Sequence, residues 1–191
     1  MEKFRMFFIG MITALGALVF ELLFFILFPA ILKSDSKIFL ILTYPIIISV
    51  LLEEFLKLAV VFKISKNNSA RGNIFLNYFF MGIGFSSVEI IFNLEKYSRY
   101  FMPILPALIG LFLIHTTTLL IFGSYFSRVQ KPIFLKSFLI FSAAAIIHLL
   151  FNLAVLREIN YWPINAGLIA FIFFLLFLSL KSPKIGDSLP E

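Results

Sequence analysis

The strongest constraint on this chain is a series of six long apolar segments, separated by short polar loops. Each segment is long enough to cross the roughly 30 Å hydrocarbon core of a bilayer as a helix, which takes about 20 residues. The chain is 61% hydrophobic and 14% charged, whereas a soluble domain carries about 25% charged residues. We therefore predict an all-α integral membrane protein, built as a bundle of about six transmembrane helices. The expected spans are 7–32, 38–62, 73–94, 104–126, 132–156 and 163–180.

The apolar segments follow one another without a soluble-domain pattern between them, so we predict a single polytopic membrane domain over residues 1–191. The first segment is too long for the apolar core of a signal peptide and no small-residue cleavage site closes it, so we expect it to be retained. The tail 181–191 is polar and contains two prolines, and we expect it to be loose.

Lysine and arginine are unevenly distributed between the two sets of loops. The loops on the side of both termini hold about ten of them, and the loops on the other side hold about five. The positive-inside rule then predicts a multi-pass protein of the cell membrane with both termini in the cytoplasm. The same loops account for the net charge of +6, so we expect the lipid bilayer as a partner and no nucleic acid.

The second segment holds three charged residues in the middle of its apolar run, Glu53, Glu54 and Lys57. A charge at the centre of a bilayer costs at least about 2.5–3.5 kcal/mol on insertion scales, so we expect these residues to serve a function. Glu53 and Lys57 are spaced i, i+4 and can pair on one helix face. Glu54 is rotated by about 100° from Glu53 and is predicted to point at a neighbouring helix or at a different part of the same cavity.

Three later segments also place ionisable groups in mid-span: Glu89, His115 and His148, the last followed one turn later by Asn152. With a rise of about 1.5 Å per residue, these groups fall into one slab near the membrane midplane. We predict that the helices enclose a shared polar cavity there, since intramembrane ionisable groups mark functional sites. Glu21, in the first segment, fits either a hydrogen-bonded carboxylate between helices or a role near this cavity.

Two classes of chemistry suit such a cavity. In hydrolysis, a glutamate takes a proton from water while histidine and asparagine stabilise the oxyanion, or His115, His148 and a carboxylate hold a zinc ion that acidifies the water. In transport, the same carboxylates bind and release protons or cations. The chain has no cysteine and no His-Glu-x-x-His motif, so the common zinc-site signatures are missing. Composition and spacing leave both classes open.

Four short motifs occur in a fixed order, each on its own expected span. They are Glu53-Glu54-x-x-Lys57, Gly82-x-Gly84-Phe85-x-x-x-Glu89, His115 with Gly123 eight residues later, and His148-x-x-x-Asn152. Together they resemble the PrsW family of intramembrane proteases, which is related to type II CAAX prenyl endopeptidases and bacteriocin-immunity (CPBP) membrane proteins. The position of Lys57 looks more like PrsW than the CAAX type, and the resemblance covers residues 53–152. The small residues Gly82 and Gly84 are also expected to let a neighbouring helix approach closely.

The resemblance implies an enzyme, a membrane-embedded protease that cuts membrane-anchored protein substrates such as anti-sigma factors. In that family pattern, Glu53 would be the general base that activates water, and Glu54 would assist or orient it. Lys57 would hold the carboxylate pair in place. The alternatives are a CAAX-prenyl-type endopeptidase, a small transporter and a non-enzymatic immunity protein.

The resemblance also implies roles for the later motif residues. His115 would orient the attacking water, His148 and Asn152 would form the oxyanion hole, and Glu89 would be a further site carboxylate. If the enzyme needs zinc, His115 and His148 would be its ligands. Because asparagine suits an oxyanion donor better than a zinc ligand, we favour a metal-free glutamate mechanism.

Overall fold

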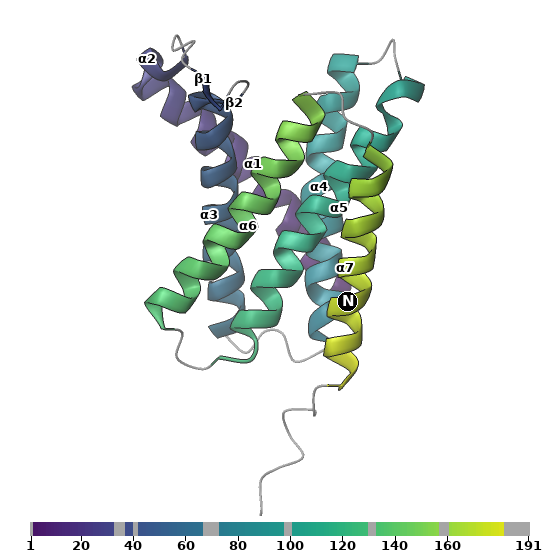
Figure 1. Ribbon diagram of the computed structural model, residues 1–191. Coiled ribbons are helices and arrows are strands. Elements are labelled where there is room, and N and C mark those ends of the chain that lie inside the picture. The colour runs from purple at the N-terminus through teal and green to yellow at the C-terminus, as the bar shows by residue number, and fades with distance from the viewer. Residues whose placement is uncertain are drawn as a thin grey trace, which may run out of the picture.

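The computed structural model describes residues 2–32, 37–39, 42–66, 73–97, 101–129, 133–156 and 161–181. These ranges are helical apart from a short hairpin and connecting residues, so the predicted all-α fold is confirmed (Figure 1). Residues 182–191 of the expected loose tail lie outside the described residues. The elements are α1 (Glu2–Leu27), α2 (Pro29–Leu32), β1 (Lys37–Phe39), β2 (Leu42–Thr43), α3 (Tyr44–Lys66), α4 (Ile74–Tyr97), α5 (Phe101–Phe126), α6 (Phe134–Leu156) and α7 (Tyr161–Lys181).

Within the described ranges, five helices are long and apolar enough to cross a membrane, as in a multi-pass membrane protein. They are α1, α4, α5, α6 and α7. The sixth expected span, 38–62, corresponds to α3, whose mid-helix charges Glu53, Glu54 and Lys57 set it apart from the other five. This helix begins at Tyr44 and not at residue 38, because the residues before it form the antiparallel hairpin of β1 and β2.

The long helices run alternately in opposite directions, so that their ends gather at two faces of the bundle (Figure 1). The lower face in this view contains the beginnings of α1, α4 and α6 and the ends of α3, α5 and α7. Both ends of the described chain therefore lie at the same face, as the predicted topology requires. Which face is cytoplasmic stays a prediction.

Helix α5 is the centre of the bundle. It packs against α3, α4, α6 and α7, while α1 lies along α4 and also contacts α3. A continuous run in the middle of α5, residues 113–120, is buried. Large apolar side chains on the outer helices are exposed instead, among them Leu22, Phe138 and Phe173. Such a surface is suited to lipid, which is as apolar as the side chains that face it.

Glycines set how closely α4 approaches its two neighbours. A Cβ atom at Gly84 would overlap the carbonyl of Phe7 in α1, and one at Gly82 would overlap Thr116 in α5. Small residues allow such close backbone contact between helices in a membrane. The expectation that Gly82 and Gly84 serve close helix packing is confirmed, and this packing fixes where α4 presents Glu89 to α5.

Candidate functional site

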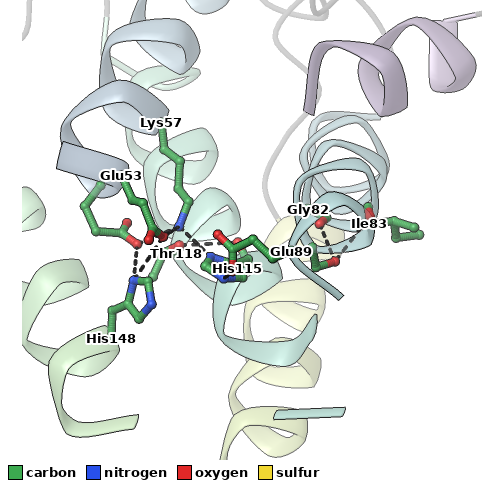
Figure 2. Close-up of polar contacts among 10 residues, drawn as sticks. Glu53, Lys57, Gly82, Ile83, Glu89, His115, Thr118 and His148 are labelled. Atoms are coloured by element: carbon green, nitrogen blue, oxygen red, sulfur yellow. Dashed lines mark hydrogen bonds and ion pairs between the residues drawn. The ribbon is translucent and has the colours of Figure 1, made fainter. Parts of the chain in front are cut away.

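Six ionisable side chains from four helices meet inside the bundle, and Figure 2 shows five of them pointing towards one another. Glu54, Lys57 and His115 are fully buried and His148 is 2% exposed. The side chains of Glu53 and Glu89 are less enclosed, with 16% and 15% of their surface exposed. We call these six residues the polar cluster: Glu53, Glu54 and Lys57 of α3, Glu89 of α4, His115 of α5 and His148 of α6.

Lys57 makes the contact that joins α3 to α5. Its Nζ lies 2.7 Å from Glu54 Oε1 and 2.7 Å from His115 Nδ1. The expected i, i+4 pair with Glu53 is longer, 3.9 Å from Nζ to Oε2. The close partner of Lys57 is therefore Glu54, at i−3, because the lysine also has to reach His115 on the neighbouring helix.

The hydrogen bonds of His115 fix its tautomer. A lysine ammonium has three donors and no acceptor, so His115 Nδ1 must accept the bond from Lys57. The ring proton then resides on Nε2, which donates to Glu89 Oε2 over 2.6 Å. Both nitrogens of His115 are thus engaged, and one imidazole links α3 to α4 through α5.

His148 of α6 also contacts the carboxylate pair. Its Nδ1 lies 2.8 Å from Glu54 Oε1 and 4.0 Å from Glu53 Oε2. With Glu54 ionised, Nδ1–H is the donor and Nε2 is left as a proton acceptor. The prediction that Glu54 points to a neighbouring helix is confirmed by this bond to α6. The two histidine rings meet edge to face, with centroids 4.9 Å apart.

The two adjacent glutamates differ in their surroundings. Glu54 is fully buried, and its Oε1 accepts from both Lys57 and His148. Glu53 is partly exposed, and among the described residues no hydrogen bond reaches its buried Oε2. Glu54 Oε1 is therefore held as a fixed acceptor by two short hydrogen bonds. Glu53 is the less enclosed of the two and is hydrogen-bonded to Glu89, with its Oε2 3.9 Å from Lys57 Nζ and 4.0 Å from His148 Nδ1.

Phe85 belongs to the site, although the sequence argument gave it no role beyond its motif. Its ring centroid lies 4.3 Å from Lys57 Nζ and 4.8 Å from the centroid of the His115 ring. A cation against an aromatic face is stabilised by the ring quadrupole, more strongly when water is excluded. The signal that could have found it is its spacing of i, i+4 from Glu89, which places both on one face of α4.

Two other intramembrane polar residues lie outside the polar cluster. Asn152, one turn after His148 on α6, is half-buried, and in the described part of the chain it makes none of the hydrogen bonds of the cluster. Glu21 of α1 is hydrogen-bonded by Ser49 of α3, as expected of a carboxylate held between helices. It also interacts electrostatically with Glu53 and Glu89, so its second expected role, near the cavity, stays open. Gly123 packs against the ring of Tyr78.

Three residues of the cluster could hold a metal ion. Glu53, His115 and His148 each offer one ligand atom, and these atoms lie within 4.8 Å of one another. Carboxylate and imidazole suit zinc, but tetrahedral bonds of 2.0–2.2 Å place ligand atoms only about 3.4 Å apart. Both His115 nitrogens are also engaged, one by the Lys57 ammonium, which repels a cation. The residue types fit zinc, and binding would require His115 to give up one hydrogen bond.

Comparison with protein-family models, with curated proteins and with solved structures finds no match.

Proposed function

We propose that this chain is an intramembrane endopeptidase of the PrsW type, in which Glu53 activates a water molecule. The observation behind the proposal is the asymmetry of the Glu-Glu pair. Glu54 Oε1 is held by two short hydrogen bonds, while the neighbouring Glu53 is less enclosed and its Oε2 lies 3.9 Å from Lys57 Nζ and 4.0 Å from His148 Nδ1, two potential proton donors. A general base needs an available oxygen and neighbours that keep it in position.

The reaction follows from these contacts. Glu53 takes a proton from water as the oxygen attacks the peptide carbonyl carbon, and it returns that proton to the leaving nitrogen when the C–N bond breaks. The Lys57 ammonium supplies positive charge near the developing oxyanion, in a site from which bulk water is excluded. Glu54 fixes the His148 tautomer, and Lys57 with Glu89 fixes that of His115, so the rings need no reorganisation during the reaction.

Zinc is the alternative way to activate the water. Glu53, His115 and His148 would hold it, and as a Lewis acid it would lower the pKa of a bound water. The metal-free mechanism is favoured because the present hydrogen bonds of His115 can all be kept.

The proposed substrate is a membrane-anchored protein. The polar cluster lies in the middle of helices whose outer surfaces are apolar, so a substrate reaches it from within or beside the bilayer. The resemblance to PrsW implies single-span substrates of the anti-sigma-factor type. The resemblance to CAAX-prenyl endopeptidases makes a lipid-modified C-terminus the second substrate class to test.

The test compares the parent with Glu53→Gln on a panel of single-span membrane peptides. Glutamine keeps the volume but cannot accept the proton, so we expect kcat to fall by roughly 10²–10⁴-fold. Thermal stability should stay near that of the parent, because glutamine has the same shape and can keep the hydrogen bond with Glu89, and none of the short hydrogen bonds of Glu54 is changed. The matched control is Glu2→Gln, which removes a carboxylate at the first residue of α1, outside the cluster, and should leave cleavage intact.

The same assay with a chelator separates the two mechanisms. Cleavage that survives chelation and needs Glu53 supports the metal-free mechanism, whereas cleavage lost to chelator and restored by zinc assigns His115 and His148 as ligands. A Glu53→Gln variant that cuts as fast as the parent would rule out Glu53 as the base.

Proton or cation transport is the second candidate. It is favoured by the buried carboxylate oxygens Glu53 Oε2 and Glu54 Oε2, which have no hydrogen-bond partner among the described residues. Ionisable groups in such positions occur in proton relays. Ion flux into liposomes that depends on Glu53, together with no cleavage of any peptide, would favour transport over proteolysis.

A further inference from the structure

A groove runs along α5, α6 and α7, on a different side of α5 from the polar cluster. Its larger part has a volume of about 490 Å³ and is lined mainly by apolar side chains such as Ile121, Ile140 and Phe171. A second hollow of about 180 Å³ continues it along the same three helices, and Ile147 lines both. Helices α6 and α7 separate towards the lower edge of Figure 1, with α5 between them.

The polar atoms of this groove are concentrated at one end. Arg128 is exposed in the turn that follows α5, and the end of α5 lies at the lower face of the bundle in Figure 1. Tyr125, almost one helical turn earlier, has a buried hydroxyl without a hydrogen-bond partner among the described residues. The residues that line the larger hollow include Arg128 and no carboxylate. The second hollow, farther from Arg128, is lined by apolar side chains alone.

The size of the groove favours an acyl chain over a helix as its occupant. A helix with a diameter of about 10 Å and a pitch of about 5.4 Å occupies roughly 420 Å³ per turn, so the larger hollow holds about one turn. An acyl chain is much thinner, and it can follow a narrow groove along several turns of the neighbouring helices. The shape therefore suits a chain with an apolar tail and one charged end.

We infer that this groove binds an anionic phospholipid. One acyl chain lies along Ile121, Ile147 and Phe171, Arg128 binds the phosphate, and the Tyr125 hydroxyl donates a hydrogen bond to the headgroup. The polar end lies at the face that the loop charges predict to be cytoplasmic, the leaflet in which anionic lipids attract basic side chains. This inference is independent of the chemistry of the polar cluster, since none of the six cluster residues lines the groove.

The test measures lipid binding to the purified full chain by native mass spectrometry, with phosphatidylglycerol and phosphatidylcholine of identical acyl chains. The parent should prefer phosphatidylglycerol, and Arg128→Gln should reduce that preference about fivefold, the contribution of one basic side chain at an anionic surface. Lys136→Gln is the matched control, because it removes an exposed cation near the start of α6 that does not line the groove. It should keep the preference of the parent.

A second variant tests the groove without touching charge. Ala143→Trp fills the larger hollow and should remove the tightly bound lipid, while the protein melts near the temperature of the delipidated parent. The inference is overturned if Arg128→Gln keeps the full preference, or if Ala143→Trp retains the lipid. It is also overturned if Ala143→Trp blocks peptide cleavage in lipid-free detergent, because the groove would then receive substrate.

Discussion

The two faces of α4 are packed in different ways. Towards α1, Gly84 brings the backbones so close that no side chain fits between them. Towards α5, Glu89 reaches out to the imidazole of His115, and the contact is a hydrogen bond of 2.6 Å. Both interfaces have close glycine contacts, at Gly84 towards α1 and at Gly82 towards α5, but only the α5 interface adds a hydrogen bond between buried ionisable side chains.

The comparison of these two interfaces indicates that helix packing alone does not require the buried charges. In lipid there is no hydrophobic force between helices, so they associate through close packing or through polar contacts. Between α1 and α4, close packing at Gly84 is joined only by polar contacts near the start of α1, such as that of Asn77 with Glu2, in the described part of the chain. Buried charges are a costly way to reach the same end, and replacing them with well-packed apolar residues is often neutral or stabilising in other proteins. The polar cluster is therefore better explained by chemistry than by stability.

The largest loss of thermal stability is expected from Lys57→Met, in the polar cluster. It leaves Glu54 buried without its ammonium partner, and breaking a buried ion pair in this way costs about 3–5 kcal/mol. Thermal unfolding in detergent measures this loss. Lys63→Met, which removes an exposed lysine from the same helix, should change the melting temperature little.

The double variant Lys57→Met with Glu54→Gln tests whether the lost stability comes from the unpaired charge of Glu54. It removes both charges, so a large part of the lost stability should return, as expected for coupled partners. If Lys57→Met alone melts like the parent, the ion pair does not hold α3 in place.

A smaller loss of thermal stability is expected from Gly84→Ala, at the interface of α1 and α4. The new Cβ overlaps the Phe7 carbonyl, so α1 and α4 must separate, and overpacking of this kind costs about 1–3 kcal/mol. Gly167→Ala is the matched control, since a Cβ there meets nothing within 4 Å. Equal melting temperatures for the two variants would contradict the close crossing of α1 and α4.

The smallest effect is expected from Asn152→Ala. Asn152 lies one turn from His148 but makes none of the described hydrogen bonds of the cluster, so we expect less than about a threefold loss of kcat, below the roughly 10²-fold of a catalytic donor. The resemblance to PrsW implies the opposite, a role in the oxyanion hole. A loss of about 10²-fold or more in the cleavage assay would show that Asn152 joins the site only when substrate is bound.

The sequence predicted the helices better than their ends. The first apolar run ends in two helices, α1 and α2, and α3 begins six residues later than expected, at Tyr44. Hydropathy alone cannot place these boundaries, because the hairpin residues before Tyr44 are as apolar as the helix that follows. The cluster was predictable because charged residues are rare in membrane spans, so each one is conspicuous.

What the sequence by itself determined is the set of helices and the six ionisable residues that they bring to one depth, since both follow from the energy of placing groups in hydrocarbon. What only the tertiary structure decided is the pairing within the set. The i, i+4 spacing predicted Glu53 as the partner of Lys57, but the lysine also reaches His115 on α5, and its close partner is Glu54. The distances between neighbouring helices depend on side-chain volumes at every crossing, such as Gly82 against Thr116, and no single segment contains that information.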